Sequence, residues 1–548
     1  MKEPFPVVSH DQWRARVETE LGGEDFERAL VTHTLEGLSI QPLYSGKTPV
    51  SPRTELAARG ARAEPRGERS WRICQLQDDP DLGTLREAIE ADLSGGGDAV
   101  WLRFDRAARL GLDGDAEEAA EYIGVEGATI YTLADMTAAF AGTDLEGVAL
   151  SLDAGANALP AAALTLAALA AGGLEPESLD LALGADPLGA LARDGELPGP
   201  LSSLEDEMAT LVAYCHRRQP RCRALAVSTL PYHDAGAQTV QELAYALATG
   251  VHYLRVLEAA GVEAETAVDQ MVFQFAIGRH LFMEIAKLRA ARLLWSRMAR
   301  ACGVEEPSPP PIHATTSART LTRRDPWNNL LRVTTQVFAA IAGGADAITS
   351  SSFDEALGRP GADGRRLARN TQSILAEEAH LGRVLDPAGG SFYVEWLTAE
   401  LARSAWTLFQ EIESRGGMAQ CLGSGFIAKQ VEKSWRQRSE RLEAGIDPIT
   451  GVTDFAPAAE ELLARPDRRP PAVVAAAARR ISEHRERRGP LNLVLAASGV
   501  ERVETCVEAA TRGATLGELT AALERDGGRP HIARFPVRRD SEPFEDEA

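Results

Sequence analysis

The sequence predicts an α/β protein built on a (β/α)8 barrel, the TIM barrel, with an N-terminal extended arm and a C-terminal helical extension. From about residue 96, short β-branched or aliphatic runs alternate with alanine- and leucine-rich segments about eight times. No glycine-rich nucleotide fingerprint follows the first run, so an open doubly wound sheet is the less favoured alternative. At 548 residues the chain exceeds one ordinary core, which predicts smaller appendages beside the barrel.

Residues 1–95 are predicted to form the arm. Ser9 can cap a helix whose apolar face carries Trp13, Val17 and Leu21. Residues 46–70 are rich in Arg, Glu, Gly and Pro and poor in large apolar residues. This composition predicts an exposed connection between the arm and the barrel.

Residues 96–400 are predicted to form the barrel. Seven runs are predicted as its strands: 99–104, 148–156, 179–187, 223–233, 271–280, 310–318 and 345–353. An eighth strand is expected after Leu381, in the segment GRVLDPAGG. A helical extension over 401–470 and a helical segment with a truncated linker over 471–548 are expected to follow.

The stretch 313–355 is predicted to fold as strand, loop, helix and strand. Asp325 and Pro326 supply an N-cap and a proline at the first helical position. Apolar residues then recur at three- and four-residue spacing from Trp327 to Ile341, and Gly343-Gly344 can form a left-handed C-cap. Two strands joined through one helix form a parallel βαβ unit.

Charge and cysteine content bound the function. The net charge of −22 argues against a nucleic-acid-binding surface. Six scattered cysteines suit a reducing compartment, and the start lacks a basic region followed by an apolar core, so we expect a cytoplasmic protein. Cys215, His216 and Cys222 lie close together, but no second ligand pair accompanies them and no metal site is expected.

Polar residues gather at the predicted carboxyl ends of the strands, where barrel enzymes keep their chemistry. They are Asp153, Asp186, Tyr232, His233, Arg279, His280, His313, Thr315, Thr316, Thr349 and Ser350 to Ser352. The inward positions are small and polar, which suggests an axis open to a narrow ligand. Alternatively, these hydroxyls only hydrogen-bond to neighbouring strands.

Three segments together resemble the adenosylcobalamin-dependent acyl-CoA mutases, above all the methylmalonyl-CoA mutase family. They are residues 232–250, 275–290 and 369–395 within a similarity that covers roughly residues 10–545. The resemblance implies a barrel that takes acyl-CoA along its axis and a flavodoxin-like domain that holds cobalamin over its C-terminal face. It is most like the small (beta) subunit of the heterodimeric enzyme.

Several positions depart from the pattern of the catalytic chains. Their Ile-Arg-Gln-Tyr motif matches residues 73–76, which places Cys74 and Leu76 at the Arg and Tyr positions. Their His-Cys-Gln-Thr-Ser-Gly motif matches residues 313–318, with Thr315 in place of Gln. Gly184 and Asp346 stand where two further glutamines are usual. The phenol and other groups that hold the substrate and the adenosyl group are therefore missing.

The resemblance also assigns roles to retained residues. His233, with Tyr232 beside it, matches the proton-donating histidine near the thioester, although it fits a strand-end histidine bonded to its neighbours equally well. The substrate-binding candidates are Arg193, which would pair with a free carboxylate, and Arg279, His313, Thr315 and Ser317. Glu355 matches an acid near the adenosyl ribose. The retained residues are either working groups or relics.

The family's cobalamin domain carries an Asp-x-His motif whose histidine ligates cobalt, and this sequence contains no Asp-x-His. The resemblance therefore implies that this chain holds no cofactor tightly and that adenosylcobalamin is carried by a partner. The favoured hypothesis is a non-catalytic small chain bound to a large catalytic mutase subunit. The alternatives are an active barrel of a split, isobutyryl-CoA-type mutase with a separate cobalamin protein, and a CoA-binding protein without a mutase partner.

Overall fold

The computed structural model describes residues 8–46, 70–175, 178–219, 221–457, 463, 465–467, 469–496 and 498–545. Its centre is a closed barrel of eight parallel strands, which confirms the predicted (β/α)8 class. The strands are β3 (Arg72–Gln77), β4 (Ala99–Arg103), β5 (Ala149–Asp153), β6 (Asp180–Ala185), β7 (Cys222–Ser228), β8 (Met271–Ile277), β9 (Ile312–Thr316) and β10 (Ala347–Thr349). β10 pairs with both β9 and β3 and so closes the barrel.

The first and last barrel strands differ from those predicted. β3 lies within the range predicted as arm, and the barrel therefore begins before residue 96. The sequence hid this strand because arginine, cysteine and glutamine interrupt its apolar pattern. The expected eighth strand after Leu381 is wrong, because Leu381–Arg383 forms one 3-10 turn and Val384 and Leu385 are exposed. The boundaries at residues 400 and 470 remain predictions.

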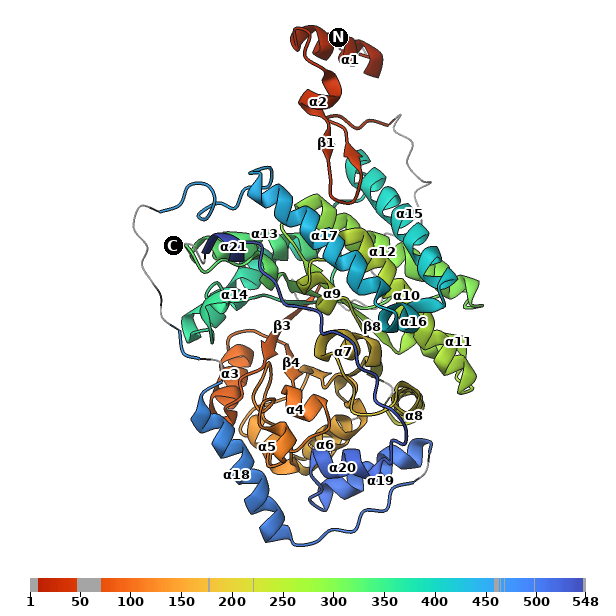
Figure 1. Cartoon of the computed structure of the whole chain (residues 1–548), viewed down its shortest axis with the longest axis vertical. Coiled ribbons are helices and arrows are strands. Elements are labelled where there is room, and N and C mark those ends of the chain that lie inside the picture. Colours follow the sequence, from red (N-terminus) through yellow and green to blue (C-terminus); the bar gives the residue numbers. More distant parts are fainter. Residues whose placement is uncertain are drawn as a thin grey trace.

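Helices surround the barrel (Figure 1). The outer ring includes α3 (Leu82–Ser94), α5 (Leu133–Ala139), α6 (Ala158–Ala171), α8 (Leu201–Arg218), α10 (Thr239–Ala259), α12 (Leu281–Ala301), α13 (Asn328–Ala342) and α14 (Ala362–Ser373). Outward strand residues such as Leu102 on β4 and Phe275 on β8 are fully buried against this ring in one continuous core. Burial of such side chains is the main favourable term for the fold.

The region Asp325–Gly344 follows the predicted order, with two corrections. Asp325 has a φ of 44° and does not cap the helix; the helix starts at Asn328, whose amide donates to the Asp325 carbonyl at 3.1 Å in a preceding turn. Trp327 and Leu331 are 49% and 68% exposed, so the buried side of the helix lies elsewhere and includes Val333 and Val337. The left-handed end is confirmed at Gly344, with a φ of 89°.

The N-terminal segment projects away from the barrel (Figure 1). It contains α1 (His10–Glu20), α2 (Phe26–Leu30) and a short hairpin of β1 (Thr32–His33) and β2 (Ser39–Ile40). Ser9 caps α1 as predicted, through a capping box with Gln12. No residue of α1 is buried.

The helices that follow the barrel in the sequence pack on the outside of its ring of helices. α15 (Phe392–Ser414) packs on α10 and α12, and α16 (Gly417–Gly423) and α17 (Phe426–Glu443) follow. α18 (Pro471–Arg488), α19 (Val500–Thr511) and α20 (Leu516–Ala522) lie on the opposite side of the barrel from α15 (Figure 1), where α19 packs on α6 and α8 and α20 packs on α6. Among the described residues, no helix is long and apolar enough to cross a membrane.

Residues 531–541, which we call the C-terminal strap, lead from the α20 side up to the carboxyl ends of the strands (Figure 1). The strap is held by main-chain bonds: Phe535 N donates to Ala192 O at 3.1 Å, and Arg538 N donates to Asp234 O at 3.0 Å. Buried Asp540 lies 3.6 Å from Arg319 and 4.0 Å from Arg438. Burial opposes the charge of Asp540, but these two arginines outweigh it and lower the pKa of the carboxyl.

We expect Gly250→Ala to destabilise the protein, because a Cβ on this α10 residue would lie 2.6 Å from the Trp295 ring of α12. Alanine favours the helix by about 1 kcal/mol but overpacking costs more, so a net loss of about 1–2 kcal/mol is expected in urea unfolding. Gly423→Ala is the control, since its Cβ would meet nothing within 4 Å. Equal stabilities of the two variants would contradict this packing.

Candidate functional site

A cavity of about 430 Å³ opens at the carboxyl ends of the barrel strands. Barrel residues such as Trp101, Arg103, Thr315 and Ser317 line it, and strap residues including Arg538 line its outer side. The carboxyl-end position is where barrel enzymes place their sites. The cavity is called the mouth cavity below.

His233 and Ser317, two predicted site residues, are joined in one buried chain of hydrogen bonds. His233 sits in α9 (Leu230–Asp234); its Nδ1 lies 2.8 Å from Glu242 Oε1 and its Nε2 lies 2.7 Å from Ser317 Oγ. Lys287 Nζ pairs with Glu242 at 3.2 Å and with Glu284 at 2.6 Å. Burial, Arg319 and Lys287 hold the pKa of His233 well below its ordinary value, so the neutral imidazole is favoured.

Tyr232 does not reach the mouth cavity. Its ring packs edge-on against Tyr245 and Phe535, and its hydroxyl has no partner among the described residues. Burial raises the pKa of this phenol well above its ordinary value. Tyr232 is therefore a core residue beside His233.

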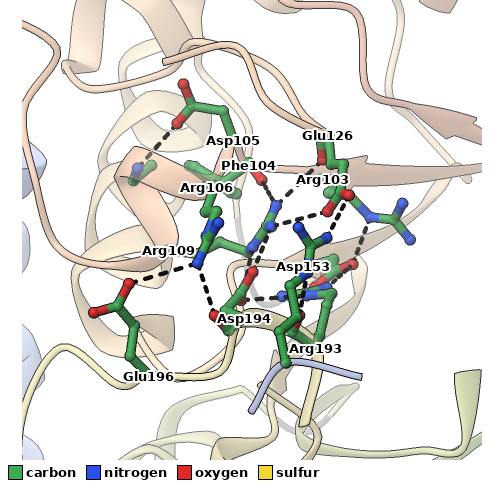
Figure 2. A network of polar contacts seen from close by, with 12 residues as sticks. Arg103, Phe104, Asp105, Arg106, Arg109, Glu126, Asp153, Arg193, Asp194 and Glu196 are labelled. Carbon is green, nitrogen blue, oxygen red and sulfur yellow. Dashed lines mark hydrogen bonds and ion pairs between the residues drawn. The ribbon is translucent and has the colours of Figure 1, made fainter. Parts of the chain in front are cut away.

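Arg193 belongs to a ladder of buried and partly buried charges between β4, β5 and α7 (Pro187–Asp194) (Figure 2). Its Nη1 lies 2.7 Å from Asp153, which also pairs with Arg103 at 2.8 Å. Arg109 and Asp194 continue the ladder with a 2.7 Å pair, in which Arg109 is 1% exposed and Asp194 is 2% exposed. The guanidinium predicted to pair with a substrate carboxylate is thus already paired with protein carboxylates.

Bulky side chains close the barrel axis below the mouth cavity, and this corrects the expectation of small inward residues throughout. Trp101 is 1% exposed and clusters with Cys74 and Leu76. Its ring meets that of His313 edge-on at 4.9 Å. At the opposite end of the axis Arg72 pairs with Asp180, which bridges β3 and β6.

His313 is buried inside the barrel, beside Trp101. Its Nε2 lies 2.8 Å from Thr349 Oγ1, and burial lowers its pKa to about 4. It does not line the mouth cavity, whereas Thr315, two residues further along β9, does. The Thr315 hydroxyl is buried and has no partner among the described residues.

The structure separates the remaining predicted residues. Leu76 and Glu355 both line the mouth cavity, but Arg279 does not. Arg279 instead reaches the Pro448 carbonyl at 3.5 Å and lies 3.9 Å from Asp447. The sequence analysis did not identify Trp101, Arg103 or the strap arginines as site residues. Because side chains alternate along a strand, the positions of Trp101 and Arg103 on β4 could have indicated that both face the axis.

The described residues that line the mouth cavity offer no cobalt ligand of the imidazole type. No histidine is among the described residues that line the mouth cavity, so no imidazole there can ligate a cobalt ion. Leu76, at the position of the family's phenol, packs against the Trp101 cluster.

Comparisons with known proteins give a consistent result. A family profile described as methylmalonyl-CoA mutase matches residues 33–529. The methylmalonyl-CoA mutase small subunit of Streptomyces virginiae is 39% identical over 90% of this chain and 78% of its own length. The large subunit from the same organism is 31% identical over 96% of this chain and 74% of its own. A methylmalonyl-CoA mutase of Cereibacter sphaeroides is 32% identical over 95% and 76%.

We expect Asp194→Asn to destabilise the protein by about 3 kcal/mol, because it leaves Arg109 buried without its main counter-charge. Burial alone would raise the pKa of Asp194, but Arg109 and Arg193 bring it down to about 2. An aspartate in the unfolded chain has a pKa of about 3.9. The stabilisation is therefore present above pH 4 and is lost as the pH falls towards 2, and the variant should lack this loss in urea unfolding measured across that range.

Glu20→Gln is the matched control for the ladder. It removes one member of the exposed pair between Arg16 and Glu20. Exposed pairs contribute little, so a change within about 0.5 kcal/mol is expected. If Asp194→Asn were as mild as this control, the ladder would not stabilise the fold.

Proposed function

Because the chain belongs to the methylmalonyl-CoA mutase family, we propose that it is the non-catalytic small subunit of a heterodimeric mutase. In this proposal it binds and stabilises a large subunit that carries adenosylcobalamin and interconverts methylmalonyl-CoA and succinyl-CoA. The small subunit itself holds no cofactor tightly, and it lies in the cytoplasm. The proposal rests most of all on the closed barrel axis.

The closed axis argues against turnover by this chain. A family member that takes acyl-CoA along its axis needs a passage for the pantetheine arm. Here Trp101 fills the middle of the axis, and the Arg72 and Asp180 pair lies across its far end. Opening this route would require moving a buried indole and breaking a partly buried ion pair, both of which cost free energy.

Occupied polar groups support the same proposal. Arg193 is committed to Asp153, and His233 to Glu242 and Ser317. Ground-state pairing of this kind stabilises the fold but leaves those groups less free to bind a thioester or a carboxylate. Leu76 offers no hydrogen bond at the phenol position.

The projecting arm suits a partner-binding role. α1 buries none of its side chains. The rest of the arm contacts the body through Leu38, which joins the main core, and through Tyr44, which packs on Tyr393 and Trp396. A second polypeptide could cover these exposed faces. A large catalytic subunit is the occupant that the small-subunit relative suggests.

We expect the purified chain neither to bind adenosylcobalamin tightly nor to turn over methylmalonyl-CoA, because no cavity histidine can ligate cobalt and the axis is closed. Equilibrium dialysis of the cofactor and a coupled mutase assay measure the two outcomes. The same assay with the large subunit added is the positive control. Robust activity with cobalamin and no other protein would contradict the proposal.

Co-purification from the native cell tests the partner. We expect a catalytic mutase chain in near one-to-one ratio by quantitative mass spectrometry, because the arm faces are uncovered in the single chain. Removing residues 1–46 should abolish this co-purification while the barrel stays folded by circular dichroism. Recovery of a small cobalamin-binding protein instead would favour the split mutase.

A further inference from the structure

Cys215 and Cys222 place two thiols in contact at the amino end of the barrel strands. Cys215 lies in the last turn of α8, and Cys222 is the first residue of β7. Their Sγ atoms are 3.1 Å apart. Both thiols are free, and the two residues are 0% and 3% exposed. Among the described residues, no other cysteine sulfur lies this close to a second one.

A short turn of the chain brings the two cysteines together. α8 ends at Arg218, and the Gln219 amide donates to the Cys215 carbonyl at 2.9 Å. The Cys222 amide then donates to the Gln219 carbonyl, also at 2.9 Å. These main-chain bonds fix the backbone of both cysteines, and close packing restricts their side chains. The fold itself therefore keeps the two sulfurs adjacent.

The pair lacks the further ligands that a structural zinc site needs. Zinc in such sites takes four protein ligands. No group of three or more histidine, cysteine, aspartate or glutamate side chains in the described part of the chain could hold a metal ion. His216, which follows Cys215 in the sequence, is exposed. Two adjacent thiols without further ligands are instead suited to thiol oxidation, in which one sulfur traps the oxidised form of the other.

The turn between the two cysteines lies at the surface and controls access to them. Burial raises the pKa of Cys222 well above its ordinary value, so this thiol is protonated and slow to react while the turn is closed. The Arg218 and Arg221 side chains on the turn are 59% and 56% exposed and pair with Glu504 and Asp180. Exposed ion pairs contribute little free energy, so local opening of this turn can admit a small oxidant.

We propose that Cys215 and Cys222 form a reversible internal disulfide when a hydroperoxide oxidises the chain. With hydrogen peroxide, one sulfur attacks the O–O bond as its thiolate and becomes a sulfenic acid, and the second oxygen leaves as water. The other thiol attacks the sulfenic sulfur and releases a second water. Two electrons pass from the two sulfurs to the peroxide, and each thiol protects its neighbour from irreversible oxidation. This site does not depend on the subunit role.

Non-reducing tryptic mass spectrometry of the whole chain tests the disulfide. The Cys302→Ser variant is used, because this exposed thiol could cross-link two chains. Trypsin cuts after Arg217, Arg218 and Arg221, so the two cysteines leave in separate peptides unless a disulfide joins them.

The peroxide dose is the one that fully oxidises Cys302 in the unaltered chain. After this dose and alkylation in urea, we expect the joined peptides and a fall in free thiols from five to three in the variant, reversed by dithiothreitol. Free thiols at both positions, a disulfide to another cysteine, or sulfinic acids without the joined peptides would each overturn the proposal.

Two further variants test the mutual protection. Cys222→Ser leaves Cys215 without a partner, so sulfinic acid at Cys215 should rise at least about fivefold over the unaltered chain at the same dose. Cys421→Ser is the matched control: this buried thiol lies outside the pair, and its sulfur is 3.7 Å from the Ile412 carbonyl oxygen, which a serine hydroxyl can also reach. The joined peptides should form in it undiminished. Equal sulfinic acid at Cys215 with and without Cys222 would refute the protection; if Cys222→Ser does not fold, Cys215→Ala with sulfinic acid measured at Cys222 decides.

Discussion

Closure of the barrel between β10 and β3 is the constraint on which the rest of the structure depends. Ala347 pairs opposite Arg72 and Thr349 pairs opposite Cys74. This pairing joins the first and the last strand of the barrel, which are far apart in the sequence. The register directs Cys74 and Leu76 into the axis beside Trp101 and fixes Arg72 at the far end, where it meets Asp180. Because side chains alternate along a strand, a shift of one residue would turn these groups outward.

The closed axis and the charge ladder have a common physical basis. A barrel with small polar inward residues has an interior that apolar packing does not fill, so its stability must come from other contacts. Here an indole fills the centre, and alternating arginines and aspartates fill the carboxyl end (Figure 2). Removing one partner of such a buried pair costs stability, because the other charge is then left unpaired. These pairs hold guanidiniums that a catalytic site would leave available.

Repeating runs and helices were enough to predict the barrel. Family motifs indicated His233 and Ser317 separately, and the hydrogen bond that joins them came only from the structure. The features that the sequence did not predict depend on strand and ion pairs between residues far apart in the chain, which a single sequence does not reveal. β3 was hidden because Arg72, Gln75 and Gln77 interrupt its apolar pattern, and the GRVLDPAGG segment misled because its apolar pair is exposed. Arg193 was placed near a substrate carboxylate, since nothing in its neighbourhood in sequence indicates Asp153, which is forty positions away.

Asp540 has a consequence for how the molecule is made. It is the counter-charge nearest to two arginines, Arg319 and Arg438, that are 4% and 5% exposed, and it lies at the end of the strap. During synthesis on the ribosome, both cations would exist long before residue 540 leaves the exit tunnel. Domains generally fold as units as the chain emerges. The charged rim of the nascent barrel therefore stays hydrated until residue 540 has left the exit tunnel, and only then can this end of the barrel exclude water.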